Sequence, residues 1–107
     1  MEQSFQKGVV LHLASLIEYT EGGVISKQLI KSPAGNITLF SFDKGEEISS
    51  HKSGGDAFVT CLDGEGEITI DSVKYILHEG ESIVMPAKHP HAVHGKEQFK
   101  MLLVVIF

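Results

Sequence analysis

The chain has 107 residues, the length of one domain with a single hydrophobic core. Its composition, with 42% hydrophobic and 21% charged residues, is that of a folded globular protein and excludes a disordered chain. The net charge is −5 and the nine basic residues are all lysines, so the chain repels phosphate and has no guanidinium to grip guanine edges; we expect no nucleic-acid partner.

The first apolar run, Val9–Ile17, is interrupted by His12 and Ser15 and lacks a small-residue cleavage site, so we interpret it as mature structure. It predicts one short helical turn over Leu11–Ile17. No stretch reaches the roughly 18 apolar residues that a membrane span needs, so no membrane partner is expected. Because the single cysteine, Cys61, has no internal disulfide partner, we expect a reducing compartment and a cytoplasmic location.

Short runs rich in β-branched and aromatic residues follow, separated by Gly, Pro and Asp turn signals. We predict strands at Asn36–Phe42, Ala57–Leu62, Glu67–Ile70, Val73–His78, Ser82–Met85 and Phe99–Phe107. The segment Asp63–Gly66 is predicted to be a hairpin turn. Many short strands with close turns predict an all-β sandwich, barrel or jelly roll. We expect one domain over residues 1–107, with an N-terminal arm at 1–23 and a barrel at 24–107.

The last predicted strand, Phe99–Phe107, is apolar at every position except Lys100. A strand that is apolar on both sides is buried on both sides. One side would face the barrel core, and the other a second layer of the same domain or a second subunit; we favour a homodimer. Lys100 either lies at the exposed start of this strand or projects into the cavity as a cation.

Histidines are the residues of this chain best suited to chemistry near neutral pH, since imidazole is also the commonest metal ligand. His89, His91 and His94 crowd the segment after Pro86, and His51 lies far from them in the chain. His94 is three residues past His91, so in a strand it faces the other way. Two histidines alone make a weak site, because metal sites usually need three protein ligands.

Two segments resemble the two sequence motifs of the cupin family. The first motif, written G-x5-H-x-H-x3-4-E-x6-G, is matched by Gly45-x5-His51-x-Ser53-x3-Ala57-x6-Gly64. The second motif, written G-x5-P-x-G-x2-H-x3-N, is matched by Gly80-x5-Pro86-x-Lys88-x2-His91-x3-Gly95. Both segments occur in the family's order, and from Gly45 to Gly95 they span about half of the chain.

This resemblance implies a double-stranded β-helix of six to eight strands, the cupin jelly-roll barrel, with a pocket at its open end. The chain is most similar to small single-domain bacterial cupins, many of which are dimers. In that family a divalent metal is usually held by two histidines and a glutamate of the first motif and a histidine of the second. The resemblance thus implies His51 and His91 as ligands of Fe, Mn, Ni or Zn.

The chain departs from this ligand set at two positions, because Ser53 stands at the second histidine and Ala57 at the glutamate. Serine is a poor ligand for a transition metal, and alanine offers no donor. Asp56 is the candidate third ligand; on a regular strand it points away from Ala57, whereas a bulge at Gly54-Gly55 would turn it inward.

Strand alternation predicts the rest of the pocket wall. If Ala57 faces inward, Cys61 does too, and Ser53 shares that face. Cys61 is either a soft ligand or nucleophile, or a small packed hydrophobe. His89 lies on a rim turn, from which it could close over a bound ligand.

The sequence is compatible with three functions, two of which are enzymatic. The first is a small-molecule-binding module with a weakly held divalent metal. The second is a metal-dependent enzyme of the dioxygenase or isomerase type, using His51 and His91 with Asp56. The third, metal-free acid–base catalysis by one of the two histidines, resembles the sugar epimerase branch of the fold.

Overall fold

The computed structural model describes residues 7–51 and 54–107; for Ser50 and His51 it describes the backbone only. In these ranges one 3-10 turn, η1 (Leu13–Ser15), precedes seven strands. The strands are β1 (Val24–Ser32), β2 (Gly35–Phe42), β3 (Glu47–His51), β4 (Asp56–Ile70), β5 (Val73–His78), β6 (Ser82–Met85) and β7 (His91–Ile106). The all-β class is confirmed.

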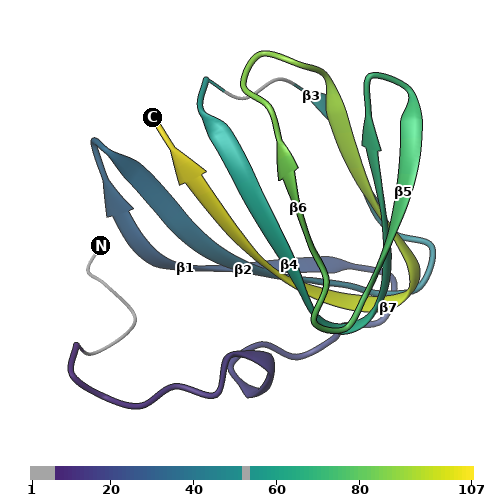
Figure 1. Cartoon of the computed structure of the whole chain (residues 1–107). Helices are drawn as coiled ribbons and strands as arrows, with labels where there is room; N and C mark the ends of the chain where they lie inside the picture. Colours follow the sequence, from purple (N-terminus) through teal and green to yellow (C-terminus); the bar gives the residue numbers. More distant parts are fainter. Residues whose placement is uncertain (1–6, 52–53) are drawn as a thin grey trace.

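All strand pairs are antiparallel, and the two long strands β4 and β7 hold the fold together. The path β1-β2-β7-β4-β5 is completed by β3, which pairs with β7, and by β6, which pairs with β4. The register divides the strands into two layers that share β4 and β7: β1, β2 and β6 pair in one layer, β3 and β5 in the other. Figure 1 shows these layers as an open barrel, with the N-terminal arm running beneath it.

The predicted hairpin at Asp63–Gly66 is wrong, because the chain bends there without reversing. Strand β4 continues through this segment with register shifts against β7 between Cys61 and Asp63 and between Gly64 and Gly66. Gly64 has φ +78°, and a Cβ on it would lie 1.6 Å from the carbonyl oxygen of Gln98. Glycine therefore lets the bent strand pass close to β7 as it moves from one layer to the other.

The barrel interior holds the main core. Its buried members come from β2, β4, β5, β6 and β7: Phe42, Ala57, Val59, Cys61, Ile68, Leu77, Met85, Val93, Phe99 and Met101. The rings of Phe42 and Phe99 stack with centroids 5.7 Å apart. As the alternation of β4 predicts, Ala57, Val59 and Cys61 all face this core.

The N-terminal arm packs on the outer face of β2 and β7. Ile17, Leu29 and Leu39 form a second buried cluster there, with Leu102 packed against it. Lys100 lies under the arm, neither at an exposed strand start nor in the cavity; its ammonium donates to the carbonyl oxygen of Ala14 at 2.6 Å. No helix in the described ranges is long and apolar enough to cross a membrane.

Candidate functional site

His91 is the first residue of β7 and lies at the open end of the barrel. The register places His51 of β3 opposite His91 on one side, and Ile70 of β4 opposite it on the other. Residues directly opposite in an antiparallel ladder occupy the same face of the sheet. The side chain of His91 is only 4% exposed. The side chain of His51 and the whole of Ser53 lie outside the described residues.

Several apolar side chains that point into the barrel are not fully buried. Phe40, Ile48, Ile70, Leu103 and Val105 pack against the interior core, yet each remains partly buried rather than buried. A side chain that points into a barrel and still contacts solvent shows that solvent reaches that part of the interior. The open end thus combines an apolar wall with a buried imidazole.

Three further polar side chains belong to this interior by register. Asn36 and Thr38 of β2 are opposite Val105 and Leu103, and Tyr75 of β5 is opposite the fully buried Ile68. The amide oxygen of Asn36 is enclosed and has no hydrogen-bond partner among the described residues.

Sequence reasoning did not single out these three residues, although their strands were predicted. The two-residue alternation of Asn36–Phe42 and Val73–His78 divides each strand into two sets of side chains. The sequence alone does not say which of the two sets faces inward.

Asp56, the expected third ligand, does not turn toward the interior. Strand β4 is regular there, with Asp56 opposite Ile106 and Ala57 opposite Val105, so the two side chains occupy opposite faces. Asp56 is exposed and accepts a hydrogen bond from the backbone N–H of Ala87 at 2.8 Å. Its carboxylate therefore fixes the β6–β7 loop from outside, and this geometry does not support its assignment as a metal ligand.

The other two histidines of the 89–94 segment have partners of their own. His89 is about half exposed, and its Nδ1 lies 2.6 Å from a carboxylate oxygen of Asp71. The backbone N–H of Asp71 also donates to the carbonyl oxygen of Pro90 at 3.1 Å, so the β4–β5 turn and the β6–β7 loop are tied together at the rim. His94 faces outward, with its Nδ1 3.7 Å from Glu67.

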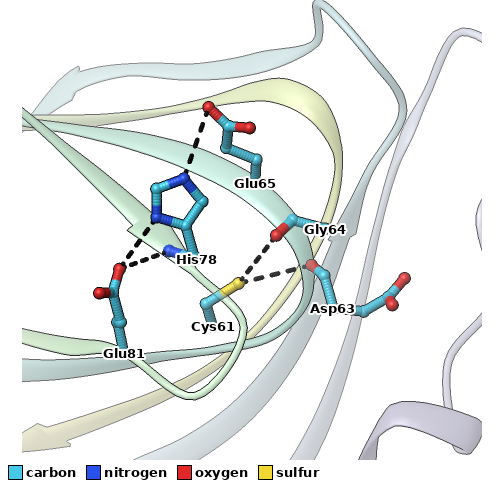
Figure 2. A network of polar contacts seen from close by, with 6 residues as sticks. All are labelled: Cys61, Asp63, Gly64, Glu65, His78 and Glu81. Atoms are coloured by element: carbon cyan, nitrogen blue, oxygen red, sulfur yellow. Dashed lines mark hydrogen bonds and ion pairs between the residues drawn. The ribbon is translucent and has the colours of Figure 1, made fainter.

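Cys61 belongs to the core and not to the open end. It lies four residues along β4 from Ala57, roughly 13 Å away. Its thiol donates to the carbonyl oxygens of Asp63 and Gly64, both at 3.5 Å (Figure 2). Burial raises the pKa of the Cys61 thiol to about 11. The thiol is therefore protonated at neutral pH and suited to packing rather than to nucleophilic attack.

A neighbouring polar cluster in Figure 2 is exposed and structural. The ring of His78 at the end of β5 lies 3.2 Å from Glu81 and 4.0 Å from Glu65. The backbone N–H of His78 also donates to Glu81 at 2.8 Å, which lowers the pKa of that carboxyl group. These contacts fix the turn between β5 and β6.

The metal that the family resemblance implies does not fit the donors that are described here. Within residues 7–49 and 54–107, no three His, Cys, Asp or Glu side chains gather in a way that could hold an ion. Ala57 is 2% exposed and carries only a methyl group at the glutamate position. Of the two motif ligand positions whose side chains are described, Ala57 and His91, only His91 offers a metal ligand.

A family model, the cupin domain, matches residues 38–107. This protein belongs to the cupin family. No curated protein matches it.

Several solved structures are similar to this cupin over most of its length. A conserved protein of unknown function from Streptococcus pyogenes is 44% identical, with 99% of this chain and 95% of that chain covered and a TM-score of 0.92. A cupin superfamily protein from Desulfitobacterium hafniense is 38% identical, with 98% and 96% covered and a TM-score of 0.91. A cupin 2 conserved barrel domain protein from Leptotrichia buccalis is 47% identical, with a TM-score of 0.89; 91% of this chain is covered, but only 47% of that chain.

A more distant likeness shows the fold alone. A salicylate 1,2-dioxygenase from Pseudaminobacter salicylatoxidans is 15% identical, with a TM-score of 0.74 over 79% of this chain and 26% of that chain. The same barrel hosts many unrelated chemistries, so function has to be argued from the interior of this particular chain.

Proposed function

We propose that this cupin binds a small organic molecule inside the open end of its barrel, with His91 and His51 as the polar centre, and that it holds any divalent ion only weakly. The observation that carries the proposal is the contrast around His91. His91 is almost fully buried, while Ile70 opposite it and other apolar side chains of the interior remain partly accessible to solvent.

The make-up of the interior supports a ligand of mixed character. Binding pockets for small molecules are mostly apolar, with a few polar groups that orient the ligand. Phe40, Leu103 and Val105 supply apolar surface, while Asn36 and Tyr75 supply an amide and a hydroxyl. The enclosed amide oxygen of Asn36 would accept a hydrogen bond from a ligand hydroxyl or N–H group.

The donor set supports weak metal binding over a metalloenzyme. Asp56 bonds to a backbone amide on the outer face, His94 faces Glu67, and Ala57 has no donor atom. Two imidazoles without a carboxylate fall short of the three protein ligands usual at catalytic metal sites. Elemental analysis of protein purified without an affinity tag tests this point: we expect substoichiometric Fe, Mn, Ni and Zn. One tightly held equivalent, lost in His91→Gln, would instead support the metal-dependent enzyme.

A fragment library screened by thermal shift tests the binding function, because a ligand that binds only the native state must raise the melting temperature. We expect fragments that stabilise the wild-type protein and His94→Gln but not His91→Gln. The two variants are matched, since both histidines are on β7 but occupy opposite faces. Tyr75→Phe provides a second test, because Tyr75 shares the inward face of β5 by register but is 41% exposed and so is not part of the core. If no fragment stabilises the wild-type protein, or if both histidine variants respond alike, the proposal fails.

A further inference from the structure

Lys31 of β1 brings a positive charge to the inner face of the barrel at its open end. Lys31 is opposite Asn36, which in turn is opposite Val105 of the interior core. Directly opposite side chains share a face and have Cβ atoms about 4.5–5.5 Å apart, so the stem of Lys31 begins beside Asn36. Figure 1 shows the β1–β2 turn, which follows Lys31, at the same end of the barrel as the β6–β7 loop.

The ammonium group of Lys31 is available to a ligand. Lys31 is exposed, and it forms no ion pair with another residue in the described ranges. A lysine stem is long and flexible, so the charge can reach over the entrance of the interior from the edge strand.

Carboxylates do not offset this charge inside the barrel. None of the described strand positions that face inward by register carries Asp or Glu. At the rim, Asp56 accepts the hydrogen bond from Ala87 on the outer side, and Asp71 is paired with His89. Within the described part of the chain, an anion that enters the open end thus meets an ammonium group and no carboxylate without a partner.

The closed end of the barrel is acidic instead. Its carboxylates lie in the β2–β3 and β5–β6 turns and at the bends of β4 and β7: Asp43, Glu46, Asp63, Glu65, Glu79, Glu81 and Glu97. Because unscreened charges act over roughly 8–10 Å at ordinary salt, an anion is repelled from the closed end and not from the open one.

A single ammonium group beside an apolar wall suits a singly charged carboxylate better than a phosphate. Phosphates are usually held by the fork of an arginine or by a helix N-terminus. The chain contains no arginine, and the helical turn Leu13–Ser15 has only three residues and belongs to the arm. Phe40 and Leu103 of the interior would contact the apolar part of the ligand.

We propose that the ligand is a small organic acid with one carboxylate, which binds at Lys31 while the apolar part of the molecule packs inside the barrel. The enclosed amide oxygen of Asn36 would then accept a hydrogen bond from a hydroxyl or N–H group next to the carboxylate. Because this names the ligand class of the same interior, it rests on the binding function proposed above.

Isothermal titration calorimetry with matched pairs of fragments tests the ligand class. The probes are small aromatic and branched aliphatic monocarboxylic acids, each paired with its own primary amide, which has nearly the same shape and no charge. We expect the acids to bind roughly tenfold more tightly than the amides, because a charge-assisted hydrogen bond is about twice as strong as a neutral one. Added NaCl should weaken the binding of the acids and leave that of the amides unchanged.

Three lysine variants test the position of the charge. Lys31→Gln should remove the preference for the acids, and Lys31→Arg, which keeps the charge, should retain it. Lys74→Gln is the matched control and should bind both kinds of fragment like the wild-type protein. Lys74 is also exposed, on β5, but it is opposite Thr69 on the outer face.

The outcomes separate the ligand class from the binding function. If the amides bind as tightly as their acids and both lose affinity in His91→Gln, the ligand class is wrong and the binding function stands. If no fragment of either kind binds, both proposals fail. A preference for acids that persists in Lys31→Gln would overturn the role of Lys31, as would a phosphate monoester that binds more tightly than the matched acid.

Discussion

Lys88 is held in a backbone conformation that suits glycine, and replacing it should stabilise the protein. The turn after β6 closes with the N–H of His89 donating to the carbonyl oxygen of Pro86 at 3.4 Å. Lys88, inside this turn, has φ +68° and an exposed side chain. It stands where the second cupin motif has glycine, so the turn explains the glycine of the motif and shows that lysine is strained there.

The expected size of the effect follows from two opposing contributions. A residue with a Cβ in the left-handed region is destabilised by about 1–2 kcal/mol. Replacement by glycine relieves this strain but destabilises the native state by about 0.5–1 kcal/mol, because glycine loses more backbone entropy on folding. Lys88→Gly should therefore stabilise the native state by about 0.5–1 kcal/mol, which corresponds to a rise of about 2–8 °C in the melting temperature.

Thermal and urea unfolding followed by circular dichroism, at one fixed protein concentration, measures this change. Lys96→Gly is the control, because Lys96 is also exposed but lies in β7 outside the positive-φ region. Its replacement should lower stability by about 0.5–1 kcal/mol through backbone entropy alone. If both variants are destabilised equally, the 86–89 turn does not hold Lys88 as described.

Three further predictions concern the bend, the core thiol and the arm. Gly64→Ala should lower the free energy of unfolding in urea by more than about 3 kcal/mol, because its Cβ would overlap a carbonyl oxygen. The control Gly80→Ala has φ +88° and open space around it, so it should lower this free energy by only about 1–2 kcal/mol. Since the pKa of Cys61 is raised to about 11, stability should fall as pH rises from about 8.5 to 11, and Cys61→Ser should remove that part of the slope; a slope unchanged in Cys61→Ser would contradict it. Burial and the hydrogen bond to a carboxylate raise the pKa of Tyr19, so Tyr19→Phe should remove a late ionisation from a spectrophotometric titration and speed hydrogen exchange in the arm; unchanged exchange would show that this contact does not hold the arm.

The strands that sequence analysis located well are those with clear alternation between sharp turns. Val73–His78 and Ser82–Met85 are predicted to the residue, and Asn36–Phe42 to within one residue of β2. The edge strand Val24–Ser32 was missed, because only Leu29 in it is buried and an exposed strand carries no alternating pattern. The 3-10 turn at Leu13–Ser15 lies inside the helical turn expected over Leu11–Ile17.

The long strands were harder to predict, because local turn residues do not reveal which strand pairs with the segment that contains them. Asp63–Gly66 carries the residues of a hairpin turn, but β7 continues beside it, so the same glycines serve a bend between two layers. Likewise β7 begins at His91, eight residues before the predicted Phe99–Phe107, because the polar segment in between is held by pairing with β3 and β4 and not by its own hydrophobicity.

The candidate site could be predicted in outline only. The two motifs placed His91 on the interior at the open end, and the regular alternation of β4 is the reason why Asp56 faces outward. The bulge that would have turned Asp56 inward depends on how β4 pairs with β7, which no local pattern encodes. The contributions of Asn36 and Tyr75 depend on the same cross-strand register.

Methyl NMR during a titration tests the central claim most directly, with the fragment that gives the largest thermal shift as the probe. If the ligand enters the open end of the barrel, the methyl resonances of Ile70, Leu103 and Val105 should shift, while those of Ile30 and Val84 on the outer face should stay in place. Shifts confined to the outer-face methyls, with the interior methyls unchanged, would contradict the account.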